Sequence, residues 1–349
     1  MIPYYIMLLV VIICALREVD LRSDSEKRKN LFFALIPVYC LLAFKDASIG
    51  SDTASYLGSY ETLAEYQDIS SLDMWGYERI EWGYKIYLMM LTSLFSNPQY
   101  LLIVSSLFVC LTLYHYINRT STNKSLALFF FVSMGFFQFA MSGIRQTLAI
   151  CIVLWSYRFI VQKKLWKFAI VVLLAMQFHK SAVVFAPVFY IANMQVSKKT
   201  VSLMFIGMFI LLFTADKILL SAADIMNYNY GIESTGNGYQ FFVIVLLITI
   251  MVVKNRDYLH HFRGSNSIMI NVNFVSLALW VVRLVSRTAE RVSLYFMPYT
   301  YVALEEYLSA LPSKNKKQYT IIAILLASFL CLKRLSSADE FNNFRFFFQ

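Results

Sequence analysis

The chain of 349 residues is 59% hydrophobic and only 15% charged, with a mean hydropathy of +0.59. A composition this apolar excludes an ordinary soluble enzyme and indicates an integral membrane protein. The net charge of +10 does not indicate nucleic-acid binding, because the basic residues occupy short loops between apolar stretches, as the positive-inside rule describes. We therefore expect membrane lipid, and no nucleic acid, around this chain.

Apolar stretches recur from one end of the chain to the other. Backbone in lipid must satisfy its own hydrogen bonds, so each stretch is expected to be a helix. The expected fold is an all-α polytopic bundle, a single membrane domain over residues 1–349, with about twelve crossings of roughly 13 to 20 residues each, against about 20 needed to cross the hydrocarbon core. The crossings are predicted at residues 2–16, 31–45, 99–117, 125–141, 145–161, 166–178, 181–193, 201–219, 239–253, 268–282, 291–308 and 319–333.

Charge assigns the loops to two sides of the membrane. Residues 46–81 hold eight acidic residues against one arginine, so this loop is expected outside. Residues 1–16 lack a basic n-region and a cleavage site, which favours a retained helix over a signal peptide. The basic loops are expected in the cytoplasm, with both termini outside, and they contain Arg17, Arg22, Lys27, Arg28, Lys29, Arg119, Lys124, Lys163, Lys164, Lys167, Lys198, Lys199, Lys254, Arg256, Arg263, Lys314, Lys316 and Lys317.

Two apolar stretches lie between the outer loop and the next basic loop, although charge parity allows only one crossing. The first, residues 82–95, is short, begins Trp82-Gly83-Tyr84-Lys85 and is followed by Asn97-Pro98. We interpret it as an interfacial or re-entrant helix, because Trp and Tyr prefer the membrane interface. Residues 46–98 are thus predicted to form an acidic outer loop with an interfacial helix.

Polar motifs then fall on the outer side. Gly50-Ser51-Asp52-Thr53, with Tyr56 after it, opens the acidic loop. Asp52 is either a turn and helix-cap residue or a carboxylate that accepts a proton or a sugar hydroxyl. Ser142-Gly143-Ile144-Arg145-Gln146 begins a helix, whose first turn favours an anion. The alternative for Arg145 is an arginine that extends to the interface.

Phe178-His179-Lys180-Ser181 lies between two short predicted helices on the same side. A single His at an interface is often a polar anchor. The neighbouring positive charge of Lys180 favours the neutral form of the imidazole, which suits a general base. His179 is therefore a candidate catalytic base beside Asp52.

Arg283, Arg287 and Arg291 are spaced four residues apart and break the positive-inside pattern. On a continuous helix they would share one face with Tyr295 and require an anion to offset their repulsion. The alternative is ion pairing with Glu290, although one carboxylate cannot neutralise three arginines. Together the outer motifs suit transfer from a phosphate-activated donor, with cations stabilising the leaving group. Because no nucleotide-binding motif is visible, such a donor would be lipid-linked.

The chain resembles the EpsG-like family of exopolysaccharide and capsule polymerases, which are related to Wzy-type O-antigen polymerases. The resemblance runs from about residue 30 to 300 and rests on five stretches in order. They are Lys45-Asp46-Ala47-Ser48-Ile49-Gly50-Ser51-Asp52-Thr53 with Tyr56, Glu81-Trp82-Gly83-Tyr84, Ser142-Gly143-Ile144-Arg145-Gln146 with Ala149, Phe178-His179-Lys180-Ser181-Ala182, and Arg291-Val292-Ser293-Leu294-Tyr295-Phe296. At Lys45 the family usually carries Arg, which has a bidentate fork that lysine lacks.

This resemblance implies a glycosyltransferase of the GT-C type in the bacterial cytoplasmic membrane, with its site facing outward. Its donor and acceptor would be undecaprenyl-pyrophosphate-linked glycans, a chain-length regulator and a flippase would act in the same pathway, and neither a metal nor another cofactor is expected. Catalysis is assigned to His179, Asp52 and Arg145. Substrate binding is assigned to Lys45, Glu81, Gln146, Lys180, Arg283, Arg287, Arg291 and Tyr295.

Other activities stay open. A flippase or transporter for lipid-linked sugar would place charges along a path near mid-bilayer, with repeat symmetry. A membrane O-acyltransferase acting on polysaccharide would place its histidine deep in a helix. A ligase that moves finished glycan to another acceptor uses the same chemistry as a polymerase.

Overall fold

The computed structural model describes residues 1–74, 80–226, 238–256, 267–284 and 286–349, and its regular elements are all helices. Part of the predicted acidic loop, residues 75–79, therefore lies outside the described residues, as do His260, His261 and Arg263 of a basic loop. The described residues form two compact units. The first contains residues 1–183 and 313–349, and the second contains residues 184–312.

Helices of the first unit cover the predicted apolar stretches within residues 1–178 and 319–333. They are α1 (Ile2–Arg17), α2 (Asp24–Ala43), α3 (Thr53–Tyr66), α4 (Ser70–Met74), α5 (Trp82–Leu94), α6 (Gln99–Thr120), α7 (Lys124–Ser133), α8 (Phe136–Ser142), α9 (Ile144–Trp155), α10 (Tyr157–Val161), α11 (Leu165–Met176), α19 (Ser313–Ser337) and α20 (Asp339–Asn342). The 3-10 helix η1 (Lys180–Phe185) begins in this unit.

Helix α1 illustrates why these segments suit a bilayer. Tyr4, Met7, Leu8 and Val11 face the protein interior at helical spacing. The opposite face is also apolar and exposed, and it consists of Ile2, Tyr5, Ile6, Leu9, Ile13 and Leu16. A helix that is apolar on all sides is stable in lipid rather than in water.

Among the described residues, three helices are long and apolar enough to span a membrane: Gln99–Thr120, Ile144–Val161 and Lys314–Ser337. Helices α7 and α8 make a fourth if counted as one span, and they are bent by 56° at their junction. Gly135 begins the second half with a φ of +109°, which a residue with a side chain rarely adopts. Shorter apolar helices occupy most other predicted crossings, so helix positions are confirmed while the count of twelve remains a prediction.

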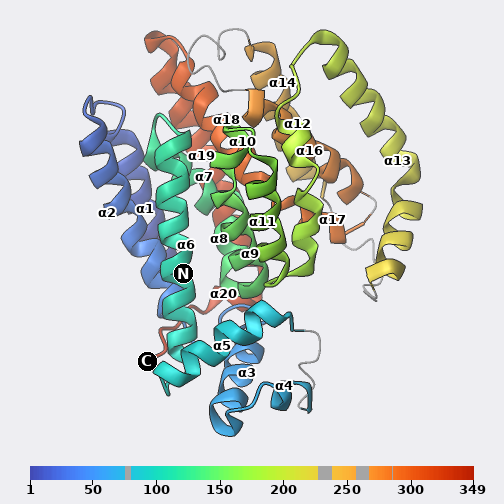
Figure 1. Cartoon of the computed structure of the whole chain (residues 1–349). Coiled ribbons are helices and arrows are strands. Elements are labelled where there is room, and N and C mark those ends of the chain that lie inside the picture. The colour runs from blue at the N-terminus through green and yellow to red at the C-terminus, as the bar shows by residue number, and fades with distance from the viewer. Residues whose placement is uncertain (75–79, 227–237, 257–266, 285) are drawn as a thin grey trace. The chain divides into compact units, whose positions relative to one another are not determined.

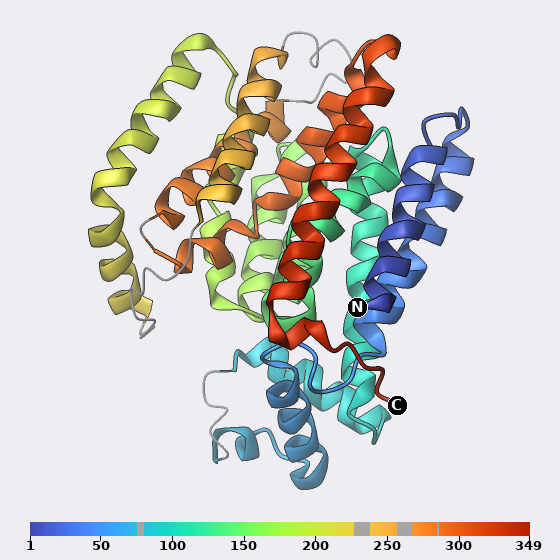
Figure 2. The same cartoon turned by 180° about the vertical axis from the view of Figure 1, so that it is seen from behind.

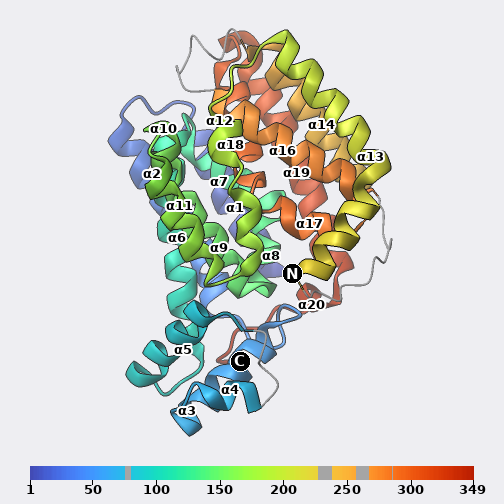
Figure 3. The same cartoon turned by 45° about the vertical axis from the view of Figure 1, so that its right-hand side comes forward.

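Helices α3, α4 and α5 lie together at one end of the first unit, and α5 runs across the ends of α6 and α9 instead of beside them (Figures 1 and 3). Trp82, Ile86, Met90 and Leu94 form an exposed apolar stripe along α5, while Tyr84 and its helical neighbours are buried. This helix is not among the apolar segments long enough to cross. An interfacial orientation of residues 82–94 agrees with this geometry.

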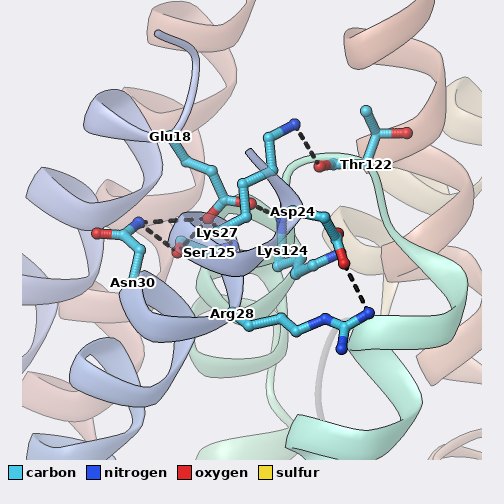
Figure 4. A network of polar contacts seen from close by, with 8 residues as sticks. All are labelled: Glu18, Asp24, Lys27, Arg28, Asn30, Thr122, Lys124 and Ser125. Carbon is cyan, nitrogen blue, oxygen red and sulfur yellow. Dashed lines mark hydrogen bonds and ion pairs between the residues drawn. The ribbon is translucent and has the colours of Figure 1, made fainter. Parts of the chain in front are cut away.

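The basic loops between α1 and α2 and between α6 and α7 lie at the opposite end of the first unit, where a buried polar network joins three helices (Figure 4). The Glu18 carboxylate is buried and accepts hydrogen bonds from the backbone N–H groups of Lys124 and Ser125 at 2.5 and 3.0 Å. A carboxylate at a helix N-terminus is stabilised by the free N–H groups there. Asn30 and Asp24 add contacts from α2.

In the second unit, α16 (Ser267–Arg283) packs against α12 (Val188–Ala192), α13 (Lys198–Met226), α14 (Tyr239–Lys254), α17 (Thr288–Ser293) and α18 (Met297–Ala310). Buried amides stabilise this packing: Asn273 donates to the Thr249 hydroxyl at 2.8 Å, and Asn271 donates to the Met194 carbonyl at 2.7 Å. Phe241 stacks on Trp280 with a centroid separation of 5.1 Å.

Candidate functional site

Arg145 lies in the first turn of α9 and forms an ion pair with the residue that precedes α5. Its Nη1 atom is 2.6 Å from Oε2 of Glu81. The Glu81 side chain is 3% exposed and that of Arg145 is 22% exposed, so little water screens the attraction. The sequence predicted both residues as site residues but did not predict that they pair.

The second carboxylate oxygen of Glu81 binds another motif. Oε1 accepts a hydrogen bond from the backbone N–H of Lys180 at 3.1 Å. Three residues after Glu81, the N–H of Tyr84 donates to the carbonyl of Gln177 at 3.1 Å. These contacts bring the start of α5, the start of α9 and the turn after α11 together, as the outer-side assignment of the motifs anticipated.

Tyr56 connects α3 to this cluster. Arg145 donates a hydrogen bond to the Tyr56 hydroxyl. Burial raises the pKa of Tyr56, while the charge and hydrogen bond of Arg145 oppose the rise. The ring of Tyr84 lies 6.1 Å from that of Tyr56. The Tyr84 hydroxyl is buried and has no hydrogen-bond partner among the described residues.

Sequence reasoning gave Tyr56 no role, although a signal was present. Tyr56 follows Asp52 by four residues, so both lie on the same side of the helix that starts there. Asp52 occupies the N-cap position of α3, yet its side chain makes no capping hydrogen bond. The carboxylate is partly exposed and makes no hydrogen bond or ion pair with any described residue. The capping alternative therefore does not describe this side chain.

His179 is half-buried, and its Nδ1 atom lies 2.6 Å from the hydroxyl of Ser181. This contact orients the imidazole ring. Lys180 is exposed, whereas Gln146 is buried in α9 next to Arg145. Asp52 lies at the start of α3, and Tyr56 of this helix contacts Arg145. Arg145 pairs with Glu81, which binds the backbone of Lys180 directly after His179.

Lys45 is fully buried just beyond the end of α2, which stops at Ala43, two residues before the predicted end of that crossing. Its ammonium donates to the carbonyls of Ile49 and Met141 at 2.9 and 2.6 Å and to the hydroxyl of Thr53. A lysine has three donors, and all three are used here. Lys45 therefore positions the loop that carries Asp52.

Burial lowers the pKa of Lys45 to about 7, and three carboxylates oppose this shift: Glu340, Asp46 and Asp52. Gly50, in the same loop, has a φ of +90°, and a Cβ at that position would overlap the Met141 carbonyl. Only glycine fits both the conformation and the space. The path of the loop between α2 and α3 is thus set by Lys45 and Gly50.

The arginines of the second unit differ from the prediction of one continuous stack. Helix α16 ends at Arg283 and α17 begins at Thr288, so the three arginines do not share one helix. Nε of Arg283 is 2.8 Å from Oε2 of Glu290, and the Arg283 side chain is 8% exposed. The ion-pair alternative therefore holds for Arg283. Arg287 and Arg291 are exposed, and Tyr295 is fully buried.

Among the described residues, no group of three or more His, Cys, Asp or Glu side chains could hold a metal ion. In comparisons with known proteins, the model of the EpsG family matches residues 29–347, which is nearly the whole chain. The matched range includes all the motif stretches above. No curated protein and no solved structure matches the chain.

Proposed function

Since the chain belongs to the EpsG family, a multi-pass membrane family whose members take part in exopolysaccharide biosynthesis, we propose that it is a polysaccharide polymerase. In this proposal it transfers a glycan chain from an undecaprenyl-pyrophosphate-linked donor to a lipid-linked repeat-unit acceptor. The reaction takes place on the outer face of the bacterial cytoplasmic membrane. A flippase and a chain-length regulator of the same pathway are the proposed partners.

One observation carries the proposal. Arg145 contacts Glu81 and Tyr56, and Glu81 also binds the backbone of Lys180. These contacts gather polar motifs from α3, α5, α9 and the turn after α11 at the end of the first unit that holds the acidic segment (Figure 1). Cationic side chains and a free carboxylate at one site are what a phosphate-activated sugar donor and a hydroxyl acceptor require.

In the proposed reaction, the bond between the donor sugar C1 and the pyrophosphate oxygen breaks. Undecaprenyl pyrophosphate leaves with the electron pair. The acceptor hydroxyl oxygen forms the new bond to C1, and its proton passes to a base. A phosphate leaving group needs cations to stabilise its charge rather than a strong acid.

Arg145 and Lys180 are the residues of the first unit proposed to bind the donor pyrophosphate. The guanidinium of Arg145 carries several N–H donors, and a guanidinium can bind a phosphate group through two of them. Lys180 is exposed while its backbone is held by Glu81. The proposed base is His179, and Asp52 is proposed to orient the acceptor sugar.

The flippase alternative is less well supported. Three ion pairs of the first unit lie at its two ends, with Asp24–Lys124 and Asp24–Arg28 at one and Glu81–Arg145 at the other. A transport path would place such charges near the middle of the membrane. The acyltransferase alternative requires a deep histidine, whereas His179 follows the C-terminal end of α11.

The test uses purified protein in lipid nanodiscs and the lipid-pyrophosphate-linked repeat unit isolated from a host strain that lacks this protein. A ladder of products that differ by one repeat unit is expected, and Arg145→Ala should abolish it. No ladder, together with movement of the same unit across proteoliposomes, would establish the flippase instead. A mass increase that depends on an added acyl donor would establish the acyltransferase.

A further inference from the structure

The C-terminal segment of the chain lies on the loop that carries Asp52, a relationship that the outer-loop motifs do not describe. Figure 2 shows this segment leaving α19 and passing beside the loop after α2. The backbone N–H of Asp46 donates to the Arg345 carbonyl at 3.0 Å, and that of Phe347 donates to the Phe44 carbonyl at 3.0 Å. Lys45 and Phe346 form an antiparallel bridge.

Glu340 makes polar contacts with Gly50 and Ser51 of this loop. Its carboxylate Oε2 accepts a hydrogen bond from the Ser51 backbone N–H at 2.6 Å. Its backbone carbonyl accepts from the Gly50 N–H at 3.3 Å. The Ser142 hydroxyl, at the end of α8, donates to the same Oε2 at 3.5 Å. One residue of the C-terminal segment therefore binds two successive amides directly before Asp52.

Aromatic contacts anchor the part of the segment that follows Glu340. Phe344 meets the buried ring of Tyr4 edge-on with a centroid separation of 5.2 Å, and Phe347 lies 6.3 Å from Phe44. The segment is thus a packed part of the first unit, joined to α1 and to the end of α2.

We propose that Glu340 is a positioning residue that holds Gly50 and Ser51 so that the Asp52 carboxylate is oriented toward the acceptor sugar. The assignment of the acceptor rests on the proposed polymerase function. Glu340 acts through the loop and does not touch substrate. Its carboxylate binds the Ser51 amide through a charge-assisted hydrogen bond, which is stronger than a neutral one.

The first measurement does not depend on enzymatic activity. Hydrogen exchange of the peptide that contains residues 46–53 is compared in purified wild type, Glu340→Ala and Glu340→Gln. Loss of a hydrogen bond to a charged group should speed exchange of the Ser51 amide by about 10- to 150-fold in Glu340→Ala. Glu340→Gln keeps an acceptor oxygen and should restore most of the protection. Asp339→Ala, the adjacent exposed residue, is the matched control and should exchange like wild type.

The second measurement uses the product ladder. Glu340→Ala should raise the KM for the acceptor by about 10-fold or more while the KM for the donor stays unchanged, and Glu340→Gln should recover it. A loss of folded protein alone would lower the amount of active enzyme without moving either KM. Wild-type exchange in residues 46–53 of Glu340→Ala would overturn the positioning role. A wild-type protein that forms no ladder would overturn the proposed function while leaving the exchange result in place.

Discussion

Oε2 of Glu81 lies 2.6 Å from Nη1 of Arg145, although 64 residues separate the two in the chain. The pair joins the start of α5, an element that does not run with the bundle, to the start of α9, which together with α10 forms a segment, Ile144–Val161, long and apolar enough to span a membrane. The same contact therefore has a structural role and, in the proposed mechanism, a catalytic one.

These two roles separate in a pair of variants. Arg145→Ala leaves the buried Glu81 carboxylate without its partner, which typically costs about 3–5 kcal/mol, so both the melting temperature and polymer formation should fall. In the double variant Glu81→Ala/Arg145→Ala no uncompensated charge remains. Its melting temperature should recover while polymer stays absent. Polymer formation by the double variant would restrict Arg145 to anchoring α5.

Tyr56→Phe tests the hydroxyl that Arg145 contacts. The ring and its packing against Tyr84 are kept, so the protein should fold normally. Losing a hydrogen bond to a charged group costs about 1.5–3 kcal/mol, and the rate of polymer formation should fall by about 10- to 150-fold if that bond orients Arg145 in the transition state. Tyr66→Phe, on an exposed position of the same helix, is the matched control. Equal rates for the two variants would exclude a role for Tyr56.

The pH dependence of the rate of polymer formation distinguishes His179 from Asp52 as the catalytic base. An imidazole base is lost when it is protonated, so the wild-type rate should fall as the pH is lowered from about 7 to about 5. His179→Gln should show a low rate without this fall. Asp52→Asn should keep the pH profile and raise the KM for the acceptor. If His179→Gln instead kept the wild-type rate and profile, the base would be Asp52.

The lowered pKa of Lys45 predicts that the stability of the protein depends on pH. The folded pKa of about 7 is below the value of about 10.4 for a lysine in an unfolded chain. Between these two values the unfolded chain binds more protons than the folded one, so this group increases stability as the pH rises. The melting temperature of wild type relative to that of Lys45→Met should therefore increase from pH 7 to pH 10. Parallel melting curves for the two proteins over this range would contradict the assignment.

The orientation of α5 predicts that the residues after its C-terminal end are accessible from outside the cell. A cysteine at Asn97, an exposed residue between α5 and α6, should react with a membrane-impermeant maleimide in intact cells. A cysteine at Lys163, in the basic loop before α11, is the control and should react only after permeabilisation. Labelling of the Asn97 cysteine only after permeabilisation would mean that residues 82–94 cross the membrane.

Hydropathy and charge were sufficient to locate the helices, because both properties can be read from each segment alone. They also predicted that α5, unlike the other apolar segments, does not cross the membrane. They also placed the outer motifs on one side, and within the first unit Glu81, Arg145 and Lys180 are in fact brought together. Which helices are neighbours depends on packing, and packing is not encoded in the hydropathy of a single segment.

Hydropathy and charge did not predict three features of the structure. The Glu81–Arg145 pair depends on α5 turning back across the bundle. The stack of Arg283, Arg287 and Arg291 assumed a continuous helix, whereas α16 ends at Arg283 and this arginine pairs with Glu290. The contacts of Glu340 with the Asp52 loop join segments that have no shared motif.

The separation of 289 residues between Ser51 and Glu340 has a consequence for biosynthesis of the protein itself. The ribosome produces the Asp52 loop first, and at about 5–20 residues per second the residue that holds it follows about 15–60 s later. In the proposed topology, the nascent chain presents this loop and α5 to the outer leaflet during that interval. A chain interrupted before residue 340 would carry every outer motif and yet lack the contact that orients Asp52. Under the proposed function, such fragments should use the lipid-linked acceptor less efficiently than the full chain.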